Sequence, residues 1–122
     1  MKNRKQPLFK SFGYAFEGIW TGISKERNMK IHCLAVILVT AVGTFVGLTP
    51  MEWCISLLLF GMVISLELVN TAVEAVVDLV TEERKPLAKI AKDTAAGAVL
   101  FTAIMAVIIG CIIFIPHFIA LL

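Results

Sequence analysis

The sequence predicts an all-α membrane protein with three transmembrane helices and an amphipathic helix at its amino terminus. The 122 residues are 59% hydrophobic, with a mean hydropathy of +0.91, which is too apolar for a soluble domain of this size. Three apolar segments, at about residues 31–48, 51–73 and 94–115, approach or exceed the roughly 20 residues that a spanning helix needs. We therefore expect one membrane-embedded domain over residues 1–122, with no room for a separate soluble domain.

The amphipathic helix is expected at about residues 8–25. Its apolar side chains recur at intervals of three and four, which describes one face of a helix. These side chains are Phe9, Phe12, Phe16, Ile19, Trp20 and Ile23. With basic neighbours and a tryptophan, the segment is typical of a helix that lies in the membrane interface. Simple anchoring to anionic lipid and a direct role in a site both remain open.

The basic residues are confined to two regions of the chain. They either precede the first span or lie between the second and third spans, as follows: Lys2, Arg4, Lys5, Lys10, Lys25, Arg27, Lys30, Arg84, Lys85, Lys89 and Lys92. The turn at Thr49-Pro50 and the tail after Pro116 have none. The positive-inside rule therefore predicts a cytoplasmic amino terminus and second connection, with the carboxyl terminus outside.

A polar stripe continues the second apolar segment. Glu67, Asn70, Glu74 and Asp78 recur at three and four, so their side chains lie along one face of a continuing helix. Counted from Trp53 at the outer interface, Glu67 lies about 21 Å deeper, at or just beneath the inner headgroups. Glu74 lies about 10 Å further along the axis, where soluble ligands can reach it. An acid at the foot of a membrane helix suggests chemistry or ion binding.

Further charged groups are expected at the same cytoplasmic level. Glu26 follows the amphipathic helix, and Lys92-Asp93 precedes the small residues 94–98, which allow another helix to pack closely. Such a set suits phosphoryl transfer to a membrane alcohol, because this reaction depends on positioning and charge neutralisation. We expect Glu67 to accept the hydroxyl proton, Glu26 and Glu74 to bind Mg²⁺ with the nucleotide phosphates, and Lys92 to offset phosphate charge. The sequence has no GxxxxGK[ST] loop, which argues against a soluble nucleotide-binding fold.

The stretches ELVNTAVEAVVD (67–78) and AKDTAAGAV (91–99) closely resemble the signature of the small bacterial integral-membrane lipid kinases, the diacylglycerol and undecaprenol kinases. The resemblance covers nearly the whole chain. It implies a homotrimer in the bacterial plasma membrane, with active sites shared between subunits and with ATP and Mg²⁺ required. It also implies site residues: Glu67 as base, Glu26 and Glu74 as metal ligands, Asn70 orienting Glu67 or the substrate, and Tyr14, Glu83, Arg84, Lys85, Lys92 and Asp93 near the nucleotide.

Departures from the family pattern bear on the lipid substrate. The enterobacterial diacylglycerol kinases have an arginine where Pro7 stands and a serine where Ala96 stands, next to the lipid. The stretch ERNMKIH (26–32) instead resembles the Gram-positive branch, whose members are similar to undecaprenol kinases. We therefore expect undecaprenol as substrate, with diacylglycerol as the alternative. Whether Lys5 or Lys10 replaces the missing arginine stays open.

Two other functions would account for some of these residues. A small proton-coupled transporter can use a lone intramembrane glutamate, but such a carboxylate belongs near the bilayer centre, whereas Glu67 lies to one side. A structural subunit would need its acids only to complete a solvated helix face. Neither reading explains Glu67, Glu74, Lys92 and Asp93 occurring together. Taken alone, Glu26 suits a solvated charge, and His32 suits interfacial packing better than metal binding.

Overall fold

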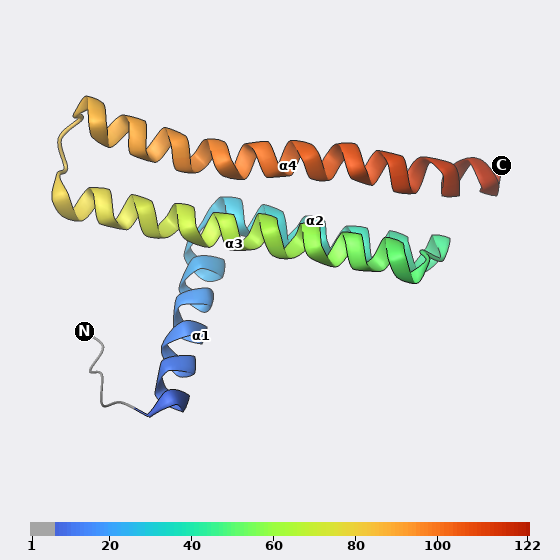
Figure 1. The fold of residues 1–122 in the computed structure, drawn as a ribbon, viewed down its shortest axis with the longest axis horizontal. Coiled ribbons are helices and arrows are strands. Elements are labelled where there is room, and N and C mark those ends of the chain that lie inside the picture. Colours follow the sequence, from blue (N-terminus) through green and yellow to red (C-terminus); the bar gives the residue numbers. More distant parts are fainter. Residues whose placement is uncertain (1–6) are drawn as a thin grey trace.

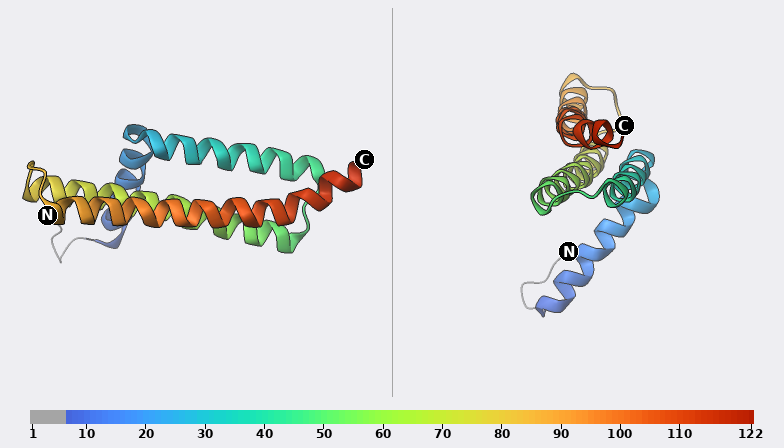
Figure 2. Two further views of the ribbon diagram at one scale, coloured as in Figure 1. Left: turned by 90° about the horizontal axis from the view of Figure 1, so that it is seen from above. Right: turned by 90° about the vertical axis from the view of Figure 1, so that its right-hand side faces the viewer.

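The structure, a computed structural model, describes residues 7–122, which form four helices and no strand. These are α1 (Leu8–Lys25), α2 (Arg27–Val46), α3 (Pro50–Val80) and α4 (Pro86–Leu121). Helices α2, α3 and α4 run roughly along one axis, and α1 leaves this bundle at a steep angle (Figure 1). Seen end-on, the three long helices occupy the corners of a triangle from which α1 extends (Figure 2).

The joint between α1 and α2 is a single extended residue. Glu26 has φ −97° and ψ 123°, which ends α1 and lets the chain change direction before α2 begins. Gly22, in the last turn of α1, is buried, and a Cβ at this position would lie 2.5 Å from Leu68 Cδ2 on α3. The side chain of Met29, in the first turns of α2, is completely buried. The absence of a side chain at Gly22 therefore lets α1 rest closely against α3.

The turn between α2 and α3 is specified by local chemistry. Gly47 ends α2 with φ +78°, a left-handed conformation that glycine adopts without steric cost. Thr49 caps α3: its hydroxyl accepts from the Glu52 N–H at 3.2 Å, and Glu52 Oε1 accepts from the Thr49 N–H at 2.9 Å. Pro50 occupies the first helical position, where its missing N–H costs nothing. The same Glu52 Oε1 lies 2.9 Å from His117 Nε2 near the end of α4.

The interior of the single chain is small and unusually polar. Within residues 7–122, the buried apolar side chains are Met29, Leu48, Val99 and Ile113, and the buried polar side chains are Ser56, Glu67, Asn70 and Thr102. Most large apolar side chains of α2, α3 and α4 face outward. Such surfaces are stable against lipid or other membrane helices, and α2, α3 and α4 are each long and apolar enough to span a bilayer. The chain is therefore a multi-pass membrane protein.

The helix ends differ from the predicted span ends. Helix α2 runs from Arg27 to Val46, so it starts before residue 31 and ends before residue 48. Helix α3 continues beyond residue 73 to Val80, and α4 starts at Pro86 and passes Pro116. Hydropathy marks only the part of a helix that lies in hydrocarbon, whereas hydrogen bonding extends the helix into the polar layers. Pro116 lies inside α4, where it has no N–H to donate to the carbonyl of residue 112.

Candidate active site

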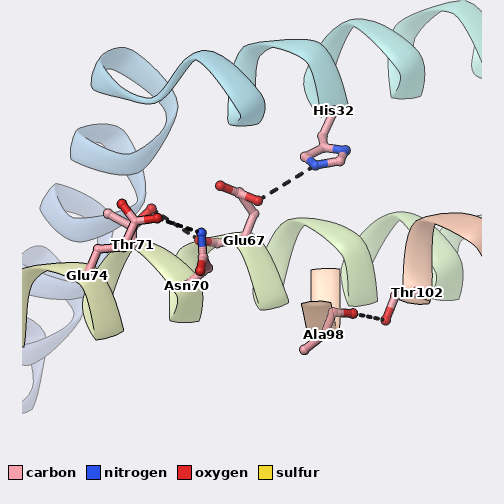
Figure 3. A network of polar contacts seen from close by, with 7 residues as sticks. All are labelled: His32, Glu67, Asn70, Thr71, Glu74, Ala98 and Thr102. Atoms are coloured by element: carbon pink, nitrogen blue, oxygen red, sulfur yellow. Dashed lines mark hydrogen bonds and ion pairs between the residues drawn. The ribbon is translucent and has the colours of Figure 1, made fainter. Parts of the chain in front are cut away.

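The polar stripe of α3 forms a bonded group that is partly buried. Only 2% of Glu67 and 5% of Asn70 is exposed. Asn70 Nδ2 donates to Glu74 Oε1 at 3.1 Å, one turn further along the helix, and Thr71 Oγ1 donates to the Glu67 carbonyl at 3.1 Å (Figure 3). The 3–4 spacing thus places these groups on one face. The stripe turns inward at Glu67 and Asn70 and reaches solvent at Asp78.

Helix α2 supplies a partner for Glu67. His32 Nε2 lies 3.7 Å from Glu67 Oε2, with the ring directed across the gap between the two helices (Figure 3). Sequence reasoning assigned His32 to interfacial packing only and so missed this pair. No spacing within one segment reveals it, because the contact depends on the register between α2 and α3.

A pocket of about 230 Å³ opens beside this pair. It is lined from three helices by Asn28, Ile31, His32, Glu67, Asn70, Ala96, Val99, Leu100 and Ala103. Asn70 Oδ1 is buried and is the one such side-chain atom in residues 7–122 that has no hydrogen-bond partner. Buried polar atoms are normally paired, so the unpaired Asn70 Oδ1 is an exception beside the Glu67 pocket. The pocket therefore has an apolar wall on α4 and polar acceptors on α3, which suits a hydroxyl group attached to a hydrocarbon.

The two expected metal ligands come from different elements. Glu26 is the residue that joins α1 to α2, and Glu74 lies on the α3 stripe. Glu26 and Glu74 are both half-buried, and both are close enough to act electrostatically on Glu67. No group of three or more His, Cys, Asp or Glu side chains able to hold a metal occurs in the part of the chain described. Two carboxylates alone nevertheless suit Mg²⁺, which usually takes one or two from the protein and completes its shell with phosphate oxygens and water.

A second polar cluster lies at the α3–α4 connection. Its pocket is lined by residues 77, 78, 81–86, 88, 89, 92 and 93, which include Glu83, Arg84, Lys85, Lys92 and Asp93. Lys92 Nζ donates to Asp78 Oδ1 at 2.6 Å, across the two helices. Asp93 accepts a hydrogen bond from Lys89 on its own helix. The predicted nucleotide residues of this connection thus line one pocket, with three further basic side chains, Arg84, Lys85 and Lys89, beside Lys92.

The remaining predicted residues are placed separately. Tyr14 is on the exposed side of α1 and lines neither of these two pockets. Ala96 lines the Glu67 pocket. Lys10 lies in the first turn of α1, where its N–H donates to the Pro7 carbonyl at 3.1 Å. Lys5 falls outside the described residues.

Comparison with known proteins gives the family. The model of the prokaryotic diacylglycerol kinases matches residues 13–114, which is most of the chain. The chain belongs to this family. It is a lipid kinase, and the family implies ATP as the phosphoryl donor.

Individual relatives differ in how closely this kinase matches them. The undecaprenol kinase of Bacillus subtilis (strain 168) is 48% identical over 94% of each chain. The diacylglycerol kinase of Synechocystis sp. is 40% identical over 94% of this chain and 66% of its own. The diacylglycerol kinase of Escherichia coli (strain K12) is 30% identical over 91% of each chain. The resemblance seen in residues 67–78 and 91–99 thus extends along nearly the whole kinase.

Proposed function

We propose that this chain is an ATP- and Mg²⁺-dependent undecaprenol kinase, built as a single membrane-embedded domain. The observation that carries the proposal is the nearly full-length match to the Bacillus subtilis undecaprenol kinase at 48% identity, against 30% for the Escherichia coli diacylglycerol kinase. The structure contributes a buried carboxylate, Glu67, in a pocket whose other wall is apolar. Such a site suits an alcohol that stays in the membrane.

In this proposal, Glu67 is the general base. The lipid hydroxyl enters the Glu67 pocket and donates its proton to the carboxylate as its oxygen bonds to the γ-phosphorus, and the bond to ADP breaks. Asn70 orients the reacting groups: its Nδ2 atom donates to Glu74 Oε1, and the residue lines the pocket beside Glu67. Ala96 contributes to the wall that the lipid contacts.

The nucleotide is proposed to bind nearer the cytoplasm. Glu83, Arg84, Lys85, Lys92 and Asp93 surround the α3–α4 connection, and Tyr14 faces outward on α1. Glu26 and Glu74 would hold Mg²⁺, which neutralises phosphate charge when bound. Lys92, held by Asp78 in the structure, would turn to the transferring phosphate.

A homotrimer with sites shared between subunits is proposed from two features. Along α3, Glu67 and Asp78 are eleven residues apart, which corresponds to about 16 Å. Within a single chain, the lipid pocket and the Lys92 cluster therefore lie apart. The outward apolar faces of α2, α3 and α4 leave room for neighbouring subunits as well as lipid. The positive-inside rule supports a cytoplasmic site and an external carboxyl terminus.

Diacylglycerol is the second candidate substrate, because the Synechocystis and Escherichia coli relatives carry that name. The deciding experiment presents purified protein with ATP, Mg²⁺ and either undecaprenol or diacylglycerol in the same bicelles. Higher kcat/KM on undecaprenol supports the proposal. A higher kcat/KM on diacylglycerol would identify that lipid as the substrate instead. Turnover of neither lipid would overturn the proposal.

A further inference from the structure

Glu67 is an acid that the fold buries almost completely. Only 3% of its side chain is exposed, and its Oε2 atom lies 3.7 Å from Nε2 of His32, whose side chain is 19% exposed. This distance is within ion-pair range and longer than a hydrogen bond. A buried carboxylate without a compensating partner is costly, so the group that faces it determines how it is held.

Two residues that line this pocket, His32 and Asn70, interact favourably with the Glu67 carboxylate. Helix α4 faces it with Ala96, Val99, Leu100 and Ala103, none of which titrates. On α2 and α3 the other polar lining residues are Asn28 and Asn70, both uncharged. The further acids that act on Glu67 are Glu74 and Glu26, which repel its negative charge. Of the side chains that line this pocket, His32 alone can carry a positive charge.

His32 also lies at a boundary. It lines both the Glu67 pocket and a second, apolar pocket of about 280 Å³ between the membrane helices. Electrostatic contacts are stronger where water is excluded, so an imidazole at this border acts on Glu67 more strongly than it would in solvent.

From these observations we propose that His32 is a positioning residue that keeps Glu67 ionised and fixes its orientation, with Oε2 toward α2 and Oε1 left for the lipid hydroxyl. The proposal rests on the proposed function, in which Glu67 is the base. His32 takes no proton from the substrate and does not touch the nucleotide. Its effect therefore falls on the rate of transfer.

Activity tests use His32→Leu and His32→Gln, with His117→Leu as the control, because His117 also faces a glutamate of α3, Glu52, but at the opposite end of that helix. His32→Leu is expected to lower kcat about 10- to 100-fold, the cost typical of a misplaced catalytic group, with little change in the KM for ATP. His32→Gln keeps an N–H donor and should recover part of kcat. Wild-type kcat in His32→Leu overturns the proposal, as does a loss in His117→Leu of the same size.

A second measurement tests the effect of His32 on Glu67 without requiring turnover. Dicyclohexylcarbodiimide reacts with protonated carboxyl groups in apolar surroundings, and mass spectrometry locates the adduct, with Glu67→Gln identifying the site. Loss of His32 should increase labelling of Glu67 severalfold, whereas His117→Leu should leave it unchanged. Equal labelling in wild type and His32→Leu overturns the proposal.

Two further comparisons separate a failure of the His32 proposal from misfolding of the variant and from a failure of the proposed function. If circular dichroism or gel filtration shows that His32→Leu does not fold, His32→Gln is read in its place and should label at an intermediate rate, with wild-type labelling overturning the proposal. Labelling requires neither lipid nor ATP. Faster labelling together with no turnover of any lipid by the wild type would therefore support the His32 pairing and refute the proposed function.

Discussion

Asn70 donates from Nδ2 to Glu74 Oε1 at 3.1 Å, which connects the buried part of the α3 stripe to its more exposed part (Figure 3). One amide thus contacts the proposed metal ligand from a residue that lines the pocket of the proposed base. In the proposed mechanism, this single side chain links the lipid and nucleotide halves of the reaction.

Breaking this link should weaken Mg²⁺ use. In Asn70→Ala, Glu74 loses the donor that orients it, and removal of an outer-shell partner typically costs about 10- to 100-fold in metal affinity. The Mg²⁺ concentration for half-maximal activity should rise accordingly, measured at saturating lipid. Glu74→Gln should show the same direction with a larger effect. Glu17→Gln, an exposed acid on α1 that lines neither pocket, is the control, and an unchanged Mg²⁺ requirement in both site variants would contradict the assignment.

Removing the carboxylate of Glu67 should abolish transfer while the fold persists. Glu67→Gln keeps the size of the side chain but cannot take a proton, so kcat should fall by about 10²- to 10⁴-fold. Turnover of undecaprenol measures the effect, and circular dichroism with gel filtration verifies folding. Glu17→Gln, an exposed acid on α1, should keep wild-type activity. Undiminished activity in Glu67→Gln would exclude it as the base.

The Lys92–Asp78 pair separates catalysis from stability. Lys92 Nζ and Asp78 Oδ1 are 2.6 Å apart, yet the side chains are 42% and 60% exposed. An exposed pair contributes about 0–1 kcal/mol, so Asp78→Asn should change stability little in thermal unfolding. Lys92→Met should instead raise the KM for ATP and lower kcat. Lys30→Met serves as the charge control, and a large loss of stability in Asp78→Asn would show that the pair is structural.

Gly43 should be required where α2 turns into α3. A Cβ at this position would lie 2.8 Å from Leu48 Cδ1 and 3.0 Å from Trp53 Cη2, and the indole ring cannot fold aside. Gly43→Ala should therefore destabilise the protein by about 1–3 kcal/mol, despite the better helix propensity of alanine. A lower melting temperature in detergent checks this. Gly18→Ala, with nothing within 4 Å of its added Cβ, should be neutral or slightly stabilising.

The sequence predicted those features that depend on one segment at a time. Periodicity identifies an amphipathic segment near residues 8–25, and the 3–4 spacing places Glu67, Asn70 and Glu74 on one face, as the structure has them. The helices extend beyond some of the predicted spans, because hydropathy marks only the apolar part of a helix and α3 continues to Val80.

Contacts between distant segments could not be predicted from the sequence, because they depend on how the helices pack against one another. His32 meets Glu67 only through the register of α2 against α3, and His117 meets Glu52 across 65 positions. The partner of Lys92 was equally hidden, since Asp78 is one of several acids on the stripe. The charges alone led to Glu26 and Glu74 as metal ligands and to Lys92 as the phosphate contact. The other nucleotide residues, and a site shared between subunits, came from the family resemblance.

Glu52 Oε1 contacts both the Thr49 N–H and His117 Nε2, each at 2.9 Å. One oxygen atom thereby fastens the α2–α3 corner to the final turns of α4, at the end of the bundle away from the Glu67 pocket. A single carboxylate thus joins two stretches of chain that are 65 positions apart, and it fixes the register of α4 against that corner without any contact to the proposed site.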